Sequence, residues 1–453
     1  MEQRFTCENF PLILCWTGSI AEKLSLTNVS RRRNFSYSKE QPLSPNKRCR
    51  LKHLVLLFVL PVLAFGQGTP SDSSVVITGK LVDQASGAGV AYATVYCRSC
   101  AFGGTVSSAE GDYVLTAEAD APAVRIDHIM YRTLETTVRA GQADVRLTAE
   151  VHELPEVVVD GTEALKLVEA AYAGLRARAD QFYRGEGFYR QTTRMDDQYT
   201  ELFEYFVDLK YSNQGIADWK VKTGRYAVNP LPDRLLFENQ SYFTRGWKVH
   251  NDAYDPAKFA VPVNPAAYRL YDFRIAGRIR KADGDVILVD ALPTEDVAAG
   301  KVIGARLYID KATATLLQAD YTLQDLDVSQ PQHGSFGPAR LSASIRFRTD
   351  VEGNPLIQSM TTQTDFTFVN PAARNYAVAV KSLFLSFPPD PMGGRVDAVA
   401  GLHFADLAEV SRKKYRAKWW DRHPVVAATP VEQAVIEAFN RAAYFGNYFD
   451  ETK

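Results

Sequence analysis

Apolar and polar side chains alternate along most of the chain from Val75 onward, and this pattern predicts strands. The clearest case is the segment 201–211, in which every second residue is apolar and most of the residues between them are charged or polar. Because successive side chains of a strand point to opposite faces, this alternation indicates a strand with one buried face. Tyr211 and four further residues form its apolar face, and these four are candidates for a ligand-binding surface: Phe203, Tyr205, Val207 and Leu209.

Residues 75–159 have the pattern of a small β-sandwich. An alternating strand begins near Val76, a turn rich in glycine follows at 86–89, and a second strand covers 91–96. A further tight turn at 108–112 leads into a third strand. Short strands at regular spacing, separated by Gly, Ser and Asp, are typical of two packed antiparallel sheets.

These strands resemble the carboxypeptidase regulatory-like domain, a transthyretin-like sandwich of Bacteroidota envelope proteins. The matching positions are Gly79, Asp83, Ala93, Val95, Gly111 and Tyr113, and the segment 154–159 resembles the closing strand of that domain. Met130 departs from the pattern, because the family has glycine there, before Tyr131. The resemblance implies the fold and an envelope location. In TonB-dependent porins this module precedes a plug and a barrel, for which this chain has too few residues, and no peptidase domain accompanies it.

Residues 186–400 predict a larger antiparallel sheet. The hairpin from Gly304 to Tyr321 resembles the curved sheet of lipoprotein-carrier and sorting-factor proteins, which wrap a sheet around an apolar cavity for acyl chains. Two arrangements remain open for the apolar faces of this sheet. Either the sheet packs on helices of the same chain, or it leaves an apolar cavity.

Two helical segments flank this sheet, a linking helix at 160–181 and a C-terminal helical tail at 401–453. In the tail, Thr429, Pro430 and Glu432 have the order of an N-cap, a first-turn proline and a capping-box glutamate. We therefore predict a mainly β protein of the α+β class. Its parts are an N-terminal transthyretin-like β-sandwich and a larger antiparallel, curved β-sheet domain with a few helices.

Residues 51–66 have the pattern of a secretory signal peptide. A basic flank precedes the apolar run Leu54–Phe65, and the small residue Gly66 follows it. The alternative is a transmembrane helix, but such a helix needs about 20 apolar residues, and Pro61 interrupts this short run. We therefore expect an exported protein of the periplasm or outer membrane, without a transmembrane helix in the mature chain.

Residues 1–50 lie upstream of this signal and have two interpretations. They are either a non-native extension, with translation beginning at residue 51, or a disordered basic tail. Residues 1–66 hold ten basic and four acidic side chains, so the remaining chain has a formal charge near −7. A chain of that charge lacks the basic surface of a nucleic-acid-binding protein.

Cys97 and Cys100 are the only cysteines after residue 66. A redox motif would need a strand–helix context, and a zinc site would need two more ligands nearby. An oxidising compartment favours a disulfide, which is our prediction for this pair. The disulfide requires a bend between the two residues, because a fully extended spacing of ~10 Å exceeds its reach.

No sequence motif identifies a catalytic site. The chain has neither the H-E-x-x-H nor the G-x-S-x-G motif, and its histidines are isolated, so we predict no catalytic residue, metal ligand or cofactor. The favoured interpretation is a non-catalytic envelope protein whose sandwich supports a domain that binds an envelope protein, a glycan or a lipid. Two alternatives remain: a periplasmic lipid or lipoprotein-carrier-like binding protein, and a hydrolase of glycan or peptide with unidentified acidic residues.

Overall fold

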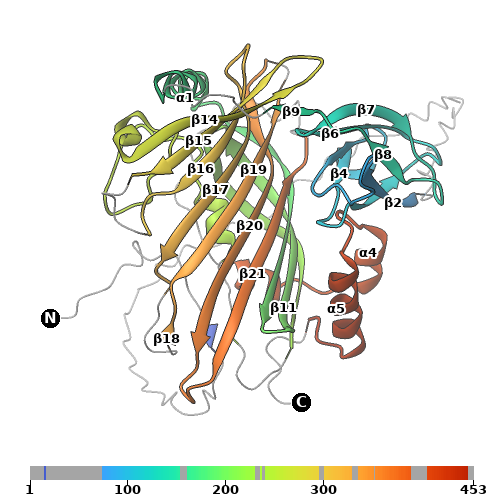
Figure 1. Ribbon diagram of the computed structural model, residues 1–453. Helices are drawn as coiled ribbons and strands as arrows, with labels where there is room; N and C mark the ends of the chain where they lie inside the picture. Colours follow the sequence, from blue (N-terminus) through green and yellow to red (C-terminus); the bar gives the residue numbers. More distant parts are fainter. Residues whose placement is uncertain are drawn as a thin grey trace, which may run out of the picture. The chain divides into compact units, whose positions relative to one another are not determined.

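The computed structural model describes residues 15–16, 74–153, 161–229, 235–236, 240–294, 300–328, 335–350, 352–388 and 406–446. The described residues from 74 onward belong to one compact unit (Figure 1). Most of the predicted extension at 1–50, the predicted signal at 51–66 and the closing strand at 154–159 lie outside the described residues. Strand β1 (Cys15–Trp16) pairs with β13 (Leu235–Leu236).

Two small sheets form the N-terminal part of the fold, residues 75–147, which we call the module. One sheet has the order β5 (Asp112–Ala117), β2 (Val75–Asp83) and β8 (Val145–Leu147). The other has the order β4 (Gly104–Val106), β3 (Thr94–Tyr96), β6 (Ala123–His128) and β7 (Tyr131–Thr137), with the short helix η1 (Ala101–Gly103) between β3 and β4. Buried side chains of both sheets meet in one core, among them Ile77, Leu81, Val95, Leu115 and Ile126.

Gly111 shows why the turn before β5 needs glycine. Its φ is +87°, and a Cβ there would lie 2.4 Å from the carbonyl oxygen of Leu81. Only a residue without a side chain accepts both the left-handed backbone and this close approach. The turn therefore feeds β5 into its pairing with β2.

The second part of the fold is a sheet of twelve strands, all paired antiparallel. Its order is β12 (Gly215–Val228), β11 (Gln198–Ser212), β10 (Tyr183–Met195), β21 (Asn375–Ser386), β20 (Pro355–Val369), β19 (Ala339–Thr349), β17 (Leu316–Leu326), β16 (Gly304–Asp310), β15 (Val286–Pro293), β14 (Tyr271–Arg280) and β9 (Val151–Glu153). The short strand β18 (Ser335–Phe336) pairs with β20. This confirms the predicted mainly β fold with antiparallel sheets and few helices.

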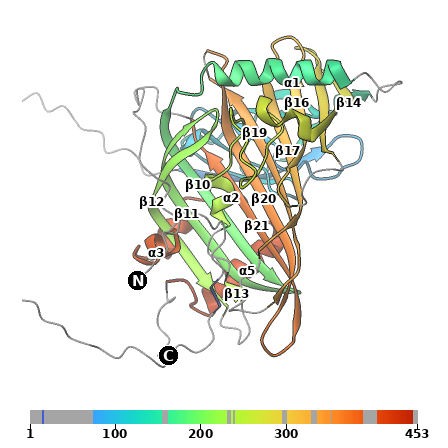
Figure 2. The ribbon, with the colours of Figure 1, turned by 90° about the vertical axis from the view of Figure 1, so that its left-hand side faces the viewer.

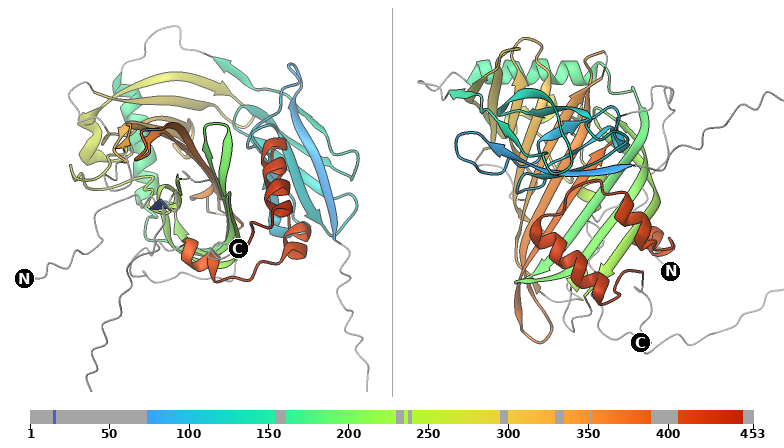
Figure 3. Two further views of the ribbon diagram at one scale, coloured as in Figure 1. Left: turned by 90° about the horizontal axis from the view of Figure 1, so that it is seen from below. Right: turned by 90° about the vertical axis from the view of Figure 1, so that its right-hand side faces the viewer.

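The inner face of the large sheet is covered by other parts of the same chain. Helix α1 (Gly161–Arg176) buries Ala164, Val168, Ala171 and Leu175 in the core on this face. Side chains of α2 (Ser241–Arg245), η2 (Pro265–Leu270) and α3 (Asp406–Ser411) enter the same core. Figure 2 shows α1 across one end of the strands and α2 between them and the viewer. Seen from below in Figure 3, the strands follow a curve around these elements.

The outer face of the large sheet carries the C-terminal helices α4 (Ala417–Arg422) and α5 (Pro430–Arg441). The predicted capping box of α5 is confirmed, since Thr429 Oγ1 accepts from the backbone N–H of Glu432 and the Glu432 carboxylate accepts from the N–H of Thr429. This box stabilises the first turn of α5.

Candidate functional site

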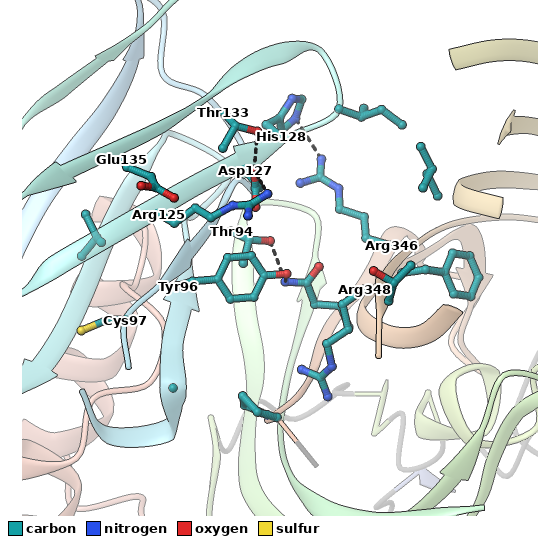
Figure 4. Close-up of a pocket in the computed structure, with 18 of the residues that line it drawn as sticks. Thr94, Tyr96, Cys97, Arg125, Asp127, His128, Thr133, Glu135, Arg346 and Arg348 are labelled. Carbon is teal, nitrogen blue, oxygen red and sulfur yellow. Dashed lines mark hydrogen bonds and ion pairs between the residues drawn. The ribbon is translucent and has the colours of Figure 1, made fainter. Parts of the chain in front are cut away.

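A cleft of 1820 Å³ lies between the module and the outer face of the large sheet. One wall is a face of the four-stranded sheet of the module, and the other includes residues of β17, β19 and β20. Polar side chains of both walls line the cleft (Figure 4): Thr94, Tyr96, Arg125, Asp127 and His128 from the module, and Arg346, Arg348 and Gln358 from the large sheet.

Strand alternation explains why this cleft is polar. In β6, Arg125 and Asp127 line the cleft while Ile126 between them is buried in the module core. In β19, Arg346 lines the cleft while Ile345 enters the core on the inner face. Each sheet therefore buries these apolar side chains in its own core, and the polar faces of the two sheets lie opposite each other.

Apolar contacts lie on either side of the polar cleft. At one end, Ile129 and Met130 of the turn between β6 and β7 pack on the outer-face cluster that includes Leu288 of β15. At the other, the ring of Phe102 lies 4.7 Å from that of Phe387 and 5.4 Å from that of Phe206. Met130, the residue that departs from the glycine of the module family, thus supplies part of the contact with the large sheet.

Gln358 of β20 connects the two walls by hydrogen bonds. Its Nε2 donates to Thr94 Oγ1 and to Tyr96 Oη, both at 2.9 Å. The Gln358 side chain is buried, and the bond to Thr94 is buried with it, whereas the bond to Tyr96 is partly buried. Burial also raises the pKa of Tyr96, which keeps this phenol neutral and able to donate.

Arg346 of β19 is a half-buried cation on the wall of the cleft. It donates to the backbone oxygen of Tyr92, and its Nη2 lies 3.0 Å from His128 Nε2. Among the described residues, no carboxylate forms an ion pair with it. Burial lowers the pKa of Arg346 to about 10, against the attraction of Asp320, so the guanidinium stays charged at neutral pH.

His128 faces this guanidinium as a neutral ring. Burial, with smaller contributions from the charges of Arg346 and Lys281, lowers the pKa of His128 to about 3. Its Nδ1 lies 3.1 Å from the backbone N–H of Met130, and its Nε2 faces Arg346. A neutral imidazole has one acceptor nitrogen, so only one of these two donors can be satisfied by the ring at a time.

Two of the other three arginines that line the cleft have partners of their own. Arg348 donates to Tyr211 Oη, to Ser386 and to the backbone oxygen of Phe387, so it holds the end of β21. Arg125 pairs with Asp127, whose Oδ1 also accepts from Thr133 at 2.6 Å. Both oxygens of Asp127 are therefore engaged. Among the described residues, Arg346, Arg98 and Lys281 line the cleft without an ion pair to a carboxylate, and of these Arg98 is exposed.

The predicted site residues lie in two different places. Cys97 and Cys100 are joined by a disulfide with a Cα–Cα distance of 5.3 Å, and the N–H of Cys100 donates to the oxygen of Cys97 across the expected bend. Cys97 lines the cleft. The apolar-face candidates Phe203, Tyr205, Val207 and Leu209 lie instead in the core on the inner face, each no more than 3 % exposed.

The described residues offer neither a metal site nor a membrane-spanning helix. No group of three or more His, Cys, Asp or Glu side chains in these residues could hold a metal ion. No helix among them is long and apolar enough to cross a membrane. The residues that make the cleft, Arg346, His128 and Gln358, were missed at the level of sequence, although the run of Ser342, Ser344 and Arg346 on one face of a long strand marks a polar outer surface.

No protein-family model matches the chain, and no curated protein matches it. Among solved structures, an outer membrane lipoprotein-sorting protein domain from Vibrio parahaemolyticus is 8 % identical over 52 % of this chain and 95 % of its own, with a TM-score of 0.21. A LolA superfamily protein from Nitrosomonas europaea is 11 % identical over 51 % and 97 %, with a TM-score of 0.19. A membrane-associated protein of unknown function from Bacteroides fragilis is 12 % identical over 70 % and 98 %, with a TM-score of 0.13. Similarity at this level assigns neither a family nor an activity to the chain.

Proposed function

We propose that this chain is a non-catalytic binding protein of the cell envelope, and that it holds an anionic ligand in the cleft between the module and the large sheet. The observation that carries the proposal is Arg346, a half-buried guanidinium without a carboxylate partner among the described residues, on the wall of an open polar cleft. A charge removed from water is costly unless it is paired, so an anionic group at Arg346 recovers energy that the protein alone does not.

The neighbours of Arg346 suit this role. Lys281 adds a second positive charge near His128, and neutral His128 offers no charge of its own to an incoming anion. The hydrogen bond between Gln358 and Tyr96 joins the two walls of the cleft. The proposed envelope location depends on the predicted signal at 51–66. The proposed relationship of the module to the regulatory-like domain depends on the sequence resemblance alone.

A binding experiment with acidic oligosaccharides tests this function. The probe is a tetrasaccharide of uronic acids, titrated calorimetrically against the wild type, with the neutral tetrasaccharide as comparison. Arg346→Gln should weaken binding of the acidic probe about 10-fold or more, since a hydrogen bond to a charged group contributes about 1.5–3 kcal/mol. The matched control is Arg306→Gln, an outer-face arginine of β16 that pairs with Asp290 and does not line the cleft.

The control variant should bind as the wild type does. Equal losses in Arg346→Gln and Arg306→Gln would show that overall charge and not the cleft attracts the probe. If the wild type binds none of three anionic probes, namely uronic acids, inorganic phosphate and sulfate esters, the proposed function is wrong.

A second candidate is transport of an apolar ligand on the inner face. The observation that favours it is the extent of apolar surface there, which runs from β12 to β14 and includes the rings of Phe203, Tyr205 and Phe384. In this structure α1, α3 and the connection 240–270 cover that surface. The candidate therefore requires these elements to move away.

A fluorescent fatty-acid probe and the variant Phe203→Ala separate the two candidates. If the inner face is permanent core, Phe203→Ala should lower the free energy of unfolding by about 3–5 kcal/mol, and the wild type should not bind the probe. Saturable binding of the probe by the folded wild type, weakened by Phe203→Ala, would favour the second candidate instead.

A further inference from the structure

The connection from the end of α3 through α4, residues 412–422, concentrates positive charge on one short stretch of the chain. It carries six basic residues and one acidic residue, whereas the whole chain has a formal charge of −1. We call this stretch the basic segment. Its basic residues are Arg412, Lys413, Lys414, Arg416, Lys418 and Arg422.

Two aromatic residues fasten the basic segment to the protein. The Tyr415 ring stacks on Phe445 with centroids 5.3 Å apart, and its hydroxyl group lies 3.1 Å from Asn440 Oδ1. Trp420 is buried on the outer face of the large sheet, with the Arg225 guanidinium 4.6 Å from its ring centroid. These contacts hold the segment in a fixed position beside α5 (Figure 3).

The basic side chains are left on the side that faces solvent. Tyr415 is half-buried, whereas Lys414 and Arg416 on either side of it are exposed. Lys418 and Arg422 are four residues apart on α4 and therefore share one face of that helix. These four residues and Arg412 are all exposed, and Lys413 is half-buried.

None of the six basic side chains forms an ion pair with a described carboxylate. The arginines beneath the same tail behave differently, because Arg190 and Arg225 both pair with the buried Glu204. The positive charge of the basic segment is thus not paired with carboxylates. Beneath the segment, by contrast, the buried arginines are paired with Glu204.

Trp419 adds an aromatic ring among these cations. It is half-buried: its ring stacks on His423 with centroids 4.4 Å apart, and it also packs against the rings of Phe206 and Trp420. Tryptophan beside exposed lysine and arginine is the composition found where a protein surface meets lipid headgroups. A nucleic acid fits less well, because the basic surface is confined to one short stretch of an acidic mature chain.

We propose that the basic segment docks the protein peripherally on a membrane surface rich in anionic phospholipid. The exposed lysine and arginine side chains bind lipid phosphates, and Trp419 lies at the level of the headgroups. Each such cation contributes about 1 kcal/mol near an anionic surface, which is about a fivefold change in partitioning. This interaction is independent of the cleft, which lies between the module and the sheet.

Vesicle co-sedimentation of the full chain tests the docking surface. Vesicles of phosphatidylcholine alone are compared with vesicles in which one third of the lipid is phosphatidylglycerol, at low and at high salt. The wild type should bind the anionic vesicles and be released by high salt, because screening weakens charge attraction. The quadruple variant Lys414→Gln, Arg416→Gln, Lys418→Gln and Arg422→Gln should bind them at least ~100-fold more weakly.

The matched control removes four exposed cations from other places in the fold: Arg139, Arg146, Arg184 and Lys301, each replaced by Gln. It loses the same charge and retains residues 1–73, so its binding should stay within about threefold of the wild type. Unchanged thermal melting of both variants shows that they are folded. The proposal is overturned if the wild type does not bind anionic vesicles, or if it binds vesicles of phosphatidylcholine alone as well as the anionic vesicles. It is also overturned if the control loses as much binding as the quadruple variant.

Discussion

At the scale of single residues, the contact between Arg346 and His128 makes the cleft sensitive to acid. The pKa of His128 lies near 3 in the folded protein, below the ordinary histidine value of 6.5, chiefly because the ring is buried. Between these two pH values the unfolded chain binds a proton that the folded chain does not. Stability from this residue is therefore complete above pH 6.5 and is lost as the pH falls toward 3.

Replacing His128 by glutamine should reduce this loss. Between pH 7 and pH 4 the wild type should lose more free energy of unfolding than His128→Gln, with a difference in slope of at most about 1.4 kcal/mol per pH unit. Urea unfolding at several pH values measures both slopes. His250, whose pKa burial also lowers, to about 4, remains in both proteins and cancels from the comparison. Equal slopes would contradict the buried, neutral state of His128.

A second residue, Glu204, holds two arginines on the outer face of the large sheet. It is 1 % exposed, and its carboxylate oxygens accept from Arg190 Nε at 2.6 Å and Arg225 Nε at 2.5 Å. Glu204→Ala should lower the free energy of unfolding by about 3–5 kcal/mol, because it leaves two cations buried without their partner. Denaturant midpoints measure this loss, and the exposed pair of Asp290 and Arg306 is the control. Asp290→Ala should cost about 1 kcal/mol or less; a similar loss in both variants would mean that burial does not set the value.

At the scale of elements, the disulfide shapes the loop that carries an apolar contact. Cys97 and Cys100 close the turn after β3, and Phe102 follows directly, with its ring against Phe387 and Phe206. The loop is short, so replacing both cysteines by serine should cost no more than about 2 kcal/mol. Mass mapping of the exported protein and thermal melting test these two points. Free thiols in the exported protein, or bound zinc, would remove the predicted disulfide.

At the scale of the whole molecule, the module and the large sheet meet through few apolar contacts. The module supplies Phe102 and Val106 to one of the contacts that flank the cleft, and Ile129 and Met130 to the other. We expect the double variant Phe102→Ala and Met130→Gly to leave both cores folded while it uncouples them. Loss of these contacts removes apolar burial between the parts and none from within either core.

Two spectroscopic signals report this uncoupling separately. All five tryptophans lie outside residues 75–147, so tryptophan fluorescence reports on the large sheet and tail, whereas far-UV circular dichroism reports on the whole chain. In urea the two signals should coincide for the wild type and separate for the double variant. Coincident transitions in the double variant would show that the remaining contacts suffice to couple the parts. These are the apolar contacts of Val106 and Ile129 and the polar contacts of Gln358 and Arg346.

The sequence by itself determined the local features of this protein. Alternation in 201–211 specified a strand and the residues of its inner face, glycine at 111 specified a turn, and Thr429 with Glu432 specified the start of α5. The alternation predicted one buried face only, whereas most of the other face of this strand is also buried, because the C-terminal tail covers it. These features depend on residues within a few positions of each other, where periodicity and capping act. The tertiary structure decided the cleft. It brings Arg346 to His128 over a separation of 218 residues and Gln358 to Thr94 over 264. Each of these residues looks like an ordinary polar position on a strand, and only the packing of two sheets against each other gives them a shared site.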